Sequence, residues 1–420
     1  MTPTEWLIIA EIGLGSVAVL PLLLQDWFNR KWLNKHPFPT FPDASGEPLP
    51  RMTVIICVRD EELVIAGKLA DLALKHYPRE LLEVLVIDTG SSDQTMQVVE
   101  DWISKAPEFG PLVRLLSTTS VAGKSAAVNL GLAESHADSE VVVLTDADSR
   151  LAVNSLERIG RWFLNPEIGA VCGQQQPIDE NGKPMLEPNA YRSYYNRARE
   201  AESRLDSTPI FEGSLAAYSR SAINAGVVAD SNADDSQLAV EARRQGLRAI
   251  HDPDIHFFEA VPRSLSAIHS QRMRRAQGLV RHLWRNSDLM LSKKMGAPMR
   301  MTMRTLFYVH IKMPALVIAS LACGIGVLLS VALNPHQWTL FPLSVAALNL
   351  SMFLAILFPP FAVRVLGYDS IRPMNALTSF AHSMAILVWV HLRIVLRLKS
   401  HIWRPIQEVR ESINRFDQLQ

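Results

Sequence analysis

Two aspartates follow a strongly apolar stretch in the middle of the sequence. Residues 141–150 read VVVLTDADSR, so Asp146 and Asp148 stand one residue apart directly after a run typical of a buried strand. Capping of a helix would account for one carboxylate but not for two. Carboxylates gathered at one site repel each other unless a cation is present. A Mg²⁺ or Mn²⁺ ion, held by one or two carboxylates and by the phosphates of a substrate, would resolve that repulsion.

Acidic residues also follow two earlier apolar runs. TVIICV leads into Arg59, Asp60 and Glu61, and VLVI leads into Asp88. In open α/β sheets, ligands bind at the carboxyl ends of the strands. If these runs are strands of one such sheet, we expect these side chains to lie beside the D-x-D pair. For Asp60, and for Asp93 further along, capping of the following helix is the alternative.

The elements that must position these residues are short strands separated by helices. Runs of β-branched and other apolar residues predict strands over 53–58, 83–87 and 140–144. Apolar residues at three- and four-residue spacing predict helices over 61–76 and 95–105. This alternation predicts βαβ units, and therefore an α/β domain whose parallel sheet is covered by helices on both faces.

Apolar segments flank this domain on both sides. Residues 6–24 are long enough to span a bilayer and lack a basic n-region and a cleavage site, which predicts a retained anchor. Basic residues follow this segment but none precedes it, which places residue 30 onward in the cytoplasm. Residues 313–333 and 338–358 predict further spans, the second broken or kinked at Pro359-Pro360. Residues 376–396 are either a span or an interfacial helix, so the number of spans and the side of the C-terminus stay open.

Composition narrows the possible functions. Lys+Arg and Asp+Glu are equal at 42 each in 420 residues, which argues against a nucleic-acid partner. The three cysteines lie far apart and form no C-x-x-C, so they predict neither a disulfide framework nor a zinc site. Arg and Lys are concentrated in residues 263–304, where Asp288 is the one acidic residue.

Several motifs in a fixed order carry a family resemblance over about residues 50–285. They are TVIICVRDEE, VLVIDTGSSDQT, GKSAAVNLGL, VVVLTDADS, FEGSLAAYSR, NADDSQLAVEARRQGLRAIHDPDIHF and QRMRRAQG. The sequence resembles the membrane-bound family 2 glycosyltransferases, which include cellulose synthase, hyaluronan synthase and poly-N-acetylglucosamine synthase. The resemblance implies a GT-A type nucleotide-sugar-binding domain, with a Rossmann-like, mostly parallel sheet, inserted between transmembrane helices.

The resemblance implies the following organisation. Residues 1–28 are the transmembrane anchor, 29–50 a linker and 51–260 the cytoplasmic GT-A domain. Residues 261–304 are basic interfacial helices with a Q-x-x-R motif, 305–400 are transmembrane or interfacial helices, and 401–420 are a tail. The protein is then a multi-pass protein of the cell membrane.

The resemblance also assigns a donor site. Arg59, Asp60 and Glu61 line the nucleotide pocket, and Asp88 faces the base, whose ring N–H a carboxylate accepts well. Lys124 meets the nucleotide or its phosphates, with an exposed loop lysine as the alternative. Asp146 and Asp148 hold the sugar nucleotide and Mg²⁺ or Mn²⁺, and Asp148 is the expected direct ligand.

Catalytic and acceptor roles fall on three further motifs. Asp235 is the implied general base beside Asp234, although the residues alone favour a helix cap for this pair. Glu212, Gly213 and Ser214 resemble the acceptor-proximal turn, where glycine permits close approach of a sugar; an ordinary tight turn is the alternative. Gln271 and Arg274 match the family's Q-x-x-R-W, with Arg274 neutralising the leaving diphosphate; attraction to anionic lipids would also explain these arginines.

The sequence departs from the family pattern at Arg275, where the motif has tryptophan. This departure puts processive synthesis in doubt but leaves sugar transfer untouched. The sequence therefore predicts an inverting glycosyltransferase that uses a nucleotide sugar, UDP-linked, and a lipid-linked or polysaccharide acceptor in contact with membrane lipids. A processive synthase that exports its polymer and a catalytically silent membrane scaffold are the alternatives. The donor sugar, the linkage and the oligomeric state are left open.

Overall fold

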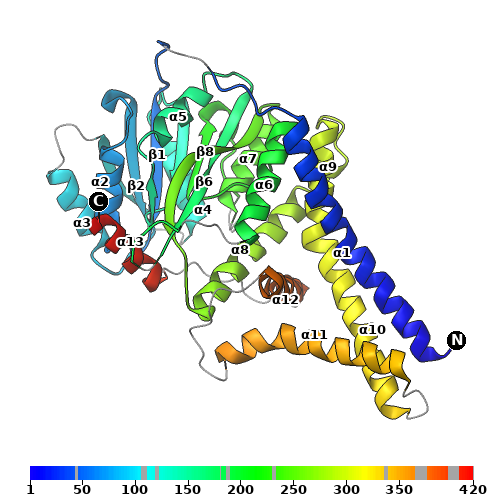
Figure 1. The fold of residues 1–420 in the computed structure, drawn as a ribbon. Coiled ribbons are helices and arrows are strands. Elements are labelled where there is room, and N and C mark those ends of the chain that lie inside the picture. Colours follow the sequence, from blue (N-terminus) through cyan, green and yellow to red (C-terminus); the bar gives the residue numbers. More distant parts are fainter. Residues whose placement is uncertain are drawn as a thin grey trace. The chain divides into compact units, whose positions relative to one another are not determined.

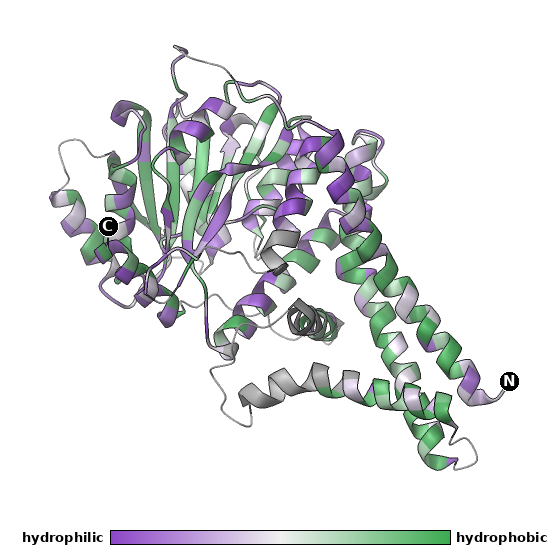
Figure 2. Ribbon diagram, in the orientation of Figure 1, coloured by the Kyte–Doolittle hydropathy of each residue, from purple (hydrophilic) through white to green (hydrophobic). Residues whose placement is uncertain are grey.

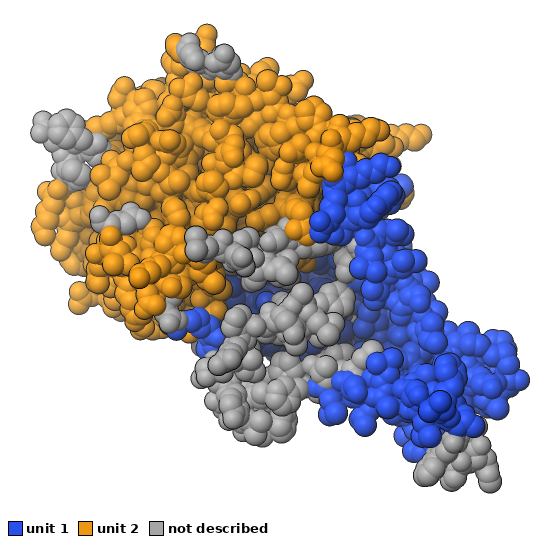
Figure 3. All heavy atoms as spheres, viewed as in Figure 1, with its two compact units in different colours: residues 1–31, 263–287, 303–401 blue, residues 32–262, 288–302, 402–420 orange. Residues whose placement is uncertain are grey.

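The computed structural model describes residues 1–42, 46–105, 111–118, 123–179, 181–185, 190–228, 233–334, 339–364, 376–395 and 406–419. By its internal contacts the chain divides into two compact units, each built from several stretches of sequence (Figure 3). Unit 1 contains residues 1–31, 263–287 and 303–401. Unit 2 contains residues 32–262, 288–302 and 402–420.

Unit 2 is built on one mixed sheet of eight strands (Figure 1). The strands are β1 (Met52–Val58), β2 (Leu82–Asp88), β3 (Leu112–Ser117), β4 (Val141–Thr145), β5 (Ser149–Leu151), β6 (Ile168–Ile178), β7 (Leu215–Ser219) and β8 (Arg248–Ala260). Their order across the sheet is β3-β2-β1-β4-β7-β6-β8-β5. The first four positions pair in parallel, whereas β7 is antiparallel to both of its neighbours. β8 runs parallel to β6, and β5 runs antiparallel to β8 at the edge.

Helices cover both faces of this sheet because side chains alternate between its faces along each strand. Val54 and Ile56 of β1 belong to one buried core, and Ile55 between them belongs to the other. The first core is closed by α2 (Ile65–Ala73), α3 (Thr95–Ser104), α5 (Ser155–Trp162) and α13 (Gln407–Leu419). The second is closed by α4 (Lys124–Glu134) and α7 (Asp234–Arg244). α6 (Ala190–Leu205) packs against β8, and short 3₁₀ helices span Arg79–Leu81, Arg220–Ile223 and Ser287–Met290.

The predicted α/β architecture is confirmed. The strands expected over 53–58, 83–87 and 140–144 are β1, β2 and β4. The helix expected over 95–105 is α3, whereas the one expected over 61–76 is α2, which begins at Ile65. Residues 59–64 are not helical because they form the loop that leaves the sheet edge.

Unit 1 is helical. The helices that lie wholly or partly in it are α1 (Pro3–Lys35), α8 (Leu265–Arg285), α9 (Ala297–Phe307), a π-helical turn (Tyr308–Lys312), α10 (Met313–Leu333), α11 (Leu340–Arg364) and α12 (Ala376–Val395). In the described chain, the helical stretches 3–35 and 297–333 are long and apolar enough to cross a membrane (Figure 2). Glu11, the acidic residue of the first apolar segment, accepts a hydrogen bond from Asn349 Nδ2 at 3.0 Å.

Three boundaries differ from the expectation. α1 continues to Lys35, so the first residues of the expected linker are helical. α11 continues through Pro359-Pro360 to Arg364, so the helix does not end at these prolines, and the alternative of a kink stays a prediction. The segment expected to be only a tail contains α13, an amphipathic helix that buries Val409, Ile413 and Phe416 in the core of unit 2.

Candidate active site

The predicted acids gather at one edge of the sheet. β1, β2 and β4 are parallel neighbours, so their carboxyl ends lie side by side. Asp60 follows the first strand, Asp88 is the last residue of the second, and Asp146 follows the third directly. Asp146, Ala147 and Asp148 form the turn between β4 and β5, which explains why two carboxylates follow one strand.

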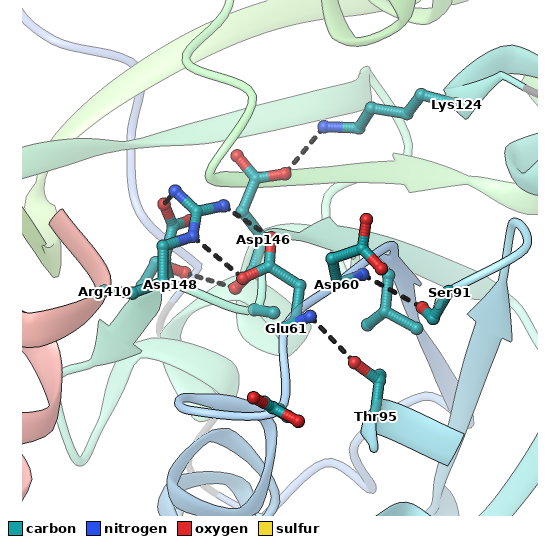
Figure 4. Close-up of polar contacts among 12 residues, drawn as sticks. Asp60, Glu61, Ser91, Thr95, Lys124, Asp146, Asp148 and Arg410 are labelled. Atoms are coloured by element: carbon teal, nitrogen blue, oxygen red, sulfur yellow. Dashed lines mark hydrogen bonds and ion pairs between the residues drawn. The ribbon is translucent and has the colours of Figure 1, made fainter. Parts of the chain in front are cut away.

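The loops after β1 and β2 bind each other through their polar groups. Asp60 has a φ of 55°, and its carboxylate accepts the backbone N–H of Ser92 at 2.7 Å. The Asp60 N–H donates to Ser91 Oγ at 3.0 Å, and the Glu61 N–H donates to Thr95 Oγ1 at 2.8 Å (Figure 4). The Ser92 backbone hydrogen bond lowers the pKa of Asp60, so this carboxylate is ionised. Asp60 therefore fastens two loops together and does not cap α2, whose N-cap is another residue.

Asp88 holds the turn that follows its own strand. Its side chain is buried and accepts the backbone N–H groups of Gly90 at 2.9 Å and Ser91 at 3.2 Å. Asp93 accepts the backbone N–H of Thr95, the first residue of α3, at 2.9 Å, which agrees with a role at the start of that helix. The expected contact between Asp88 and a nucleotide base, like that of Arg59 in the same pocket, stays a prediction.

A lysine neutralises the first aspartate of the D-x-D turn. Lys124 is the first residue of α4, and its Nζ lies 2.6 Å from Asp146 Oδ1. Burial lowers the pKa of this lysine, but Asp146, together with Cys57 and Asp234, more than compensates, so the pKa lies above its usual value. The other oxygen of Asp146 accepts a hydrogen bond from Ser214 Oγ at 3.1 Å. Lys124 is thus part of the acidic site and not the exposed loop lysine considered as an alternative.

The second aspartate of the turn is paired with an arginine from the far end of the sequence. Arg410 of α13 places Nη1 2.9 Å from Asp148 Oδ2. The same guanidinium donates from Nε to Glu61 Oε2 at 2.9 Å and from Nη2 to Glu61 Oε1 (Figure 4). Burial raises the pKa of Glu61 to about 7, although Arg410 opposes that shift. Glu61 is therefore buried against Arg410 and belongs to the same cluster as Asp148.

The predicted general base lies in the first turn of α7. Asp234 is buried and accepts Ser125 Oγ at 2.7 Å, while the Asp235 carboxylate lies against the backbone of Gly213. A Cβ atom at Gly213 would lie 3.1 Å from Asp235 Oδ2. Burial raises the pKa of Asp235 to about 6, and the charge of Lys124 counteracts part of the shift. Neither aspartate is the N-cap of the helix, which is Ala233.

The residues around Gly213 link the base to the D-x-D turn. Ser214 donates its hydroxyl to Asp146, and its carbonyl accepts Thr145 Oγ1 at 2.8 Å. Glu212 forms an ion pair with Arg199 of α6 at 2.7 Å. The motif FEGS therefore contacts both the predicted donor acids and the predicted base, which supports its assignment to the site over an ordinary turn.

The remaining predicted pair lies in unit 1. Gln271 and Arg274 are three residues apart on α8, so they share one face of that helix. Their expected contact with the diphosphate stays a prediction.

The acids at the sheet edge fit a divalent cation that takes most of its ligands from its substrate. Among the described residues no three His, Cys, Asp or Glu side chains form a group that could hold a metal by themselves. Mg²⁺ and Mn²⁺ are usually bound by one or two carboxylates together with substrate phosphates and water. Asp146 and Asp148 are partly exposed, with 32% and 13% of their side chains accessible, and each carboxylate has two oxygens. These two residues would hold such an ion.

Three basic residues that support the site were missed by the sequence analysis. Lys68 of α2 is buried and donates to Thr145 Oγ1 at 2.8 Å and to the Ser149 carbonyl at 3.0 Å. Arg150 donates to the Ala147 carbonyl at 2.8 Å and pairs with Asp417 of α13. Together with Arg410, which pairs with Asp148, they contact the D-x-D turn and the strand residues on either side of it. Only Arg150, two residues after Asp148, carried a signal by its position.

Comparison with known proteins agrees with this geometry. The model of "Glycosyl transferase family 2" matches residues 53–226, and that of "Glycosyl transferase family group 2" matches residues 141–390, more than half of the chain. A mannosyltransferase from Pyrobaculum calidifontis, solved in complex with GDP-Man and Mn²⁺, superposes with a TM-score of 0.74 at 28% identity. That likeness covers 94% of this chain and 100% of the other.

Curated relatives are matched over part of their length. A probable glycosyltransferase, YdaM of Bacillus subtilis (strain 168), is 30% identical over 163 residues, 37% of each chain. An N-acetylglucosaminyltransferase of Rhizobium meliloti (strain 1021) is 26% identical over 288 residues, 64% of this chain and 65% of the relative. A beta-monoglucosyldiacylglycerol synthase of Synechocystis is 30% identical over 129 residues, 31% of this chain and 26% of the relative. Each match thus spans less than two thirds of the relative.

The site and the comparisons lead to one conclusion. The sheet order, the D-x-D turn and the matching family models identify a GT-A fold that uses a nucleotide sugar. The chain belongs to glycosyl transferase family 2 and is a glycosyltransferase.

Proposed function

We propose that this protein is a membrane-integral, inverting glycosyltransferase that moves a hexosyl group from a UDP-linked sugar to a lipid-linked or polysaccharide acceptor. The observation that carries the proposal is the position of Lys124. Its ammonium pairs with Asp146 of the D-x-D turn, and its charge also acts on Asp235. Ser214 also donates to Asp146 while its neighbour Gly213 lies against Asp235, so the acids that would bind the donor and the carboxylate that would act as base belong to one site.

Asp235 is suited to accept the proton of the acceptor. Its carboxylate lies against Gly213, where the absence of a side chain lets it approach the backbone of the FEGS motif. As the acceptor oxygen forms its bond to the anomeric carbon, its proton passes to Asp235 and the bond to the diphosphate breaks. The nucleoside diphosphate leaves with the electron pair. One such displacement inverts the configuration at the anomeric carbon.

The donor is held by the opposite side of the site. Asp146 and Asp148 would bind Mg²⁺ or Mn²⁺, which when bound neutralises the charge that develops on the leaving diphosphate. Lys124 adds a fixed positive charge beside Asp146. The role of Gln271 and Arg274 at the diphosphate stays a prediction from the family resemblance. The similar mannosyltransferase was solved with Mn²⁺, which supports a divalent ion here.

A lipid-linked acceptor at the membrane surface is favoured by three observations. The chain has helical stretches at 3–35 and 297–333 that could cross a membrane, and one relative is named for a glycolipid, beta-monoglucosyldiacylglycerol. Arg275 stands where the polymerising members of the family have tryptophan. Other relatives are named as a poly-beta-1,6-N-acetyl-D-glucosamine synthase, so polymer synthesis is the competing outcome.

The test is transfer from labelled UDP- and GDP-sugars by membranes that contain the protein and Mn²⁺ or Mg²⁺. Label in the organic-extractable fraction supports a lipid acceptor, and label in high-molecular-weight material indicates a polysaccharide synthase. The anomeric configuration of the product, read by NMR, tests inversion. Binding of a nucleotide sugar without turnover of any acceptor would overturn the proposal in favour of a silent scaffold.

A further inference from the structure

The C-terminal helix α13 contributes a residue to the donor site although both matching family models end before it, at residues 226 and 390. Its Arg410 is buried, with 7% of its side chain accessible, and contacts two acids that come from different loops. Glu61 lies in the loop after β1, and Asp148 ends the D-x-D turn. One guanidinium therefore connects two of the loops at the sheet edge where the predicted donor-binding acids gather, which we call the donor edge.

A second ion pair holds the same helix against the same turn. Asp417 lies seven residues after Arg410, two helical turns away and on the same face. Its carboxylate oxygens accept Arg150 Nε and Nη2, each at 2.7 Å. Arg150 in turn donates to the Ala147 carbonyl within the D-x-D turn and to the Val64 carbonyl in the loop before α2. The helix thus contacts residues 147–150 through two ion pairs, Arg410 with Asp148 and Asp417 with Arg150.

The helix is also seated by packing that does not involve charge. Ile413, between Arg410 and Asp417 on the same face, is fully buried in the core of unit 2. The rings of Phe416 and Phe258 of β8 lie 5.4 Å apart. Gly67 of α2 leaves space for the Asp417 carboxylate, because a Cβ atom at Gly67 would lie 2.1 Å from its Oδ2. The position of Arg410 is therefore fixed by contacts that are independent of the acids it binds.

From these contacts we propose that Arg410 is a positioning residue for the metal–diphosphate site, supplied by the C-terminal helix. Its Nη1 fixes one oxygen of Asp148 and leaves the other oxygen to face a cation, while its Nε and Nη2 fix Glu61. This inference rests on the proposed use of a metal-bound nucleotide sugar. Partners that orient a ligating carboxylate typically change metal affinity by about 10- to 100-fold when they are replaced.

The experiment measures Mn²⁺ affinity of the full-length protein by electron paramagnetic resonance, with and without UDP or GDP. For Arg410→Gln we expect Mn²⁺ to bind about 10- to 100-fold more weakly. Arg410→Lys keeps the positive charge but cannot contact Glu61 and Asp148 at the same time through several N–H groups, so Mn²⁺ affinity should fall by a smaller factor. Arg415→Gln is the matched control, because Arg415 lies on the same helix, is half exposed and forms an ion pair with Glu411 of that helix at 3.9 Å; its Mn²⁺ affinity should equal that of wild type.

A second variant tests the helix without altering any charge. Gly67→Ala places a methyl group 2.1 Å from Asp417 Oδ2 and 2.7 Å from Arg150 Nη2, so the ion pair that joins α13 to the D-x-D turn must rearrange and Mn²⁺ affinity should fall in the same direction as in Arg410→Gln. Unchanged Mn²⁺ affinity in Arg410→Gln would reduce Arg410 to a structural role. Tighter binding would show that Arg410 competes with the metal, and either result overturns the inference. A wild-type protein that binds no Mn²⁺ with either nucleotide would instead contradict the proposed function.

Discussion

Gly213 presents bare backbone to the carboxylate of Asp235, and a Cβ atom at that glycine would lie 3.1 Å from Asp235 Oδ2. The glycine therefore allows the carboxylate to lie close to this backbone. Its neighbour Ser214 donates to Asp146, so a shift of this backbone would disturb the base and the D-x-D turn together.

Gly213→Ala should lower kcat substantially while the Tm changes little. The added methyl group requires the Asp235 carboxylate to move by a few tenths of an ångström, and a small misplacement of a reacting group can slow a reaction by about 100-fold. The measurement compares kcat, donor KM and Tm with those of wild type. Gly246→Ala provides a comparison at a glycine with no neighbouring side chain, although its positive φ of 90° will cost stability. An unchanged kcat in Gly213→Ala would contradict the contact with the base.

Asp235→Asn should abolish transfer while donor binding remains. The amide cannot accept the proton of the acceptor hydroxyl, and loss of a general base typically slows a reaction by about 100- to 10,000-fold. The raised pKa means that the ionised aspartate destabilises the fold at neutral pH, since the folded state holds its proton more tightly than the unfolded chain. The variant should therefore have a Tm at pH 7.5 equal to or above that of wild type. Asp138→Asn, at a largely exposed side chain, is the control, and substantial turnover by Asp235→Asn would remove Asp235 from the base role.

The rate of transfer should fall as the pH is lowered through about 6. Burial raises the pKa of Asp235 to about 6, and the base acts only when it is ionised. Below that pH, kcat/KM should drop by about tenfold per pH unit, because the free enzyme must lose this proton before it reacts. A profile that stays flat down to pH 5 would show that another group sets the reaction rate.

Lys124→Met should weaken donor binding, with a smaller loss in Lys124→Arg. The ammonium lies 2.6 Å from Asp146 Oδ1, and without it two neighbouring carboxylates lose a compensating charge. Charge-assisted hydrogen bonds of this kind contribute about 1.5–3 kcal/mol, so the Kd for UDP or GDP with Mn²⁺ should rise by roughly 10- to 100-fold. Lys105→Met, at the exposed end of α3, should leave that Kd unchanged. A wild-type Kd in Lys124→Met would limit this lysine to a structural role.

Removal of divalent metal should stop transfer reversibly. Treatment with EDTA followed by dialysis should abolish activity, and added Mn²⁺ or Mg²⁺ should restore it, because Asp146 and Asp148 offer oxygen ligands that such ions prefer. The restored rate as a function of metal concentration gives the affinity of the site. Full activity after chelation would contradict the assignment of these aspartates to a metal.

The donor edge of the sheet was predictable because it depends on short-range patterns. A buried strand followed by acids is visible in ten residues, and the parallel order of β1, β2 and β4 places those acids together. The hydrogen bonds of Asp60 with Ser92 and of Asp88 with its own turn were not visible, since loop conformation depends on side chains from two segments.

The role of α13 could not be read from the sequence. Arg410 of this helix and its partner Glu61 are 349 residues apart in the sequence. The pattern of an amphipathic helix of 13 residues does not identify the surface on which the helix packs. Lys68 was missed for a related reason. A lysine on a helix is normally solvated, and only the fold shows that Thr145 and Ser149 take up its donors.

The separation of Glu61 and Arg410 has a consequence for how the enzyme is made. At a translation rate of about 5–20 residues per second, roughly 20 to 70 seconds pass between the synthesis of the two residues. During that interval the helices α8 to α12 are synthesised, and Glu61 and Asp148 lack the arginine that joins them. The nascent chain on the ribosome therefore lacks the complete cluster of Glu61, Asp148 and Arg410 until the apolar helical stretch 297–333 has been synthesised, and a ribosome that stalls before residue 410 leaves that cluster incomplete.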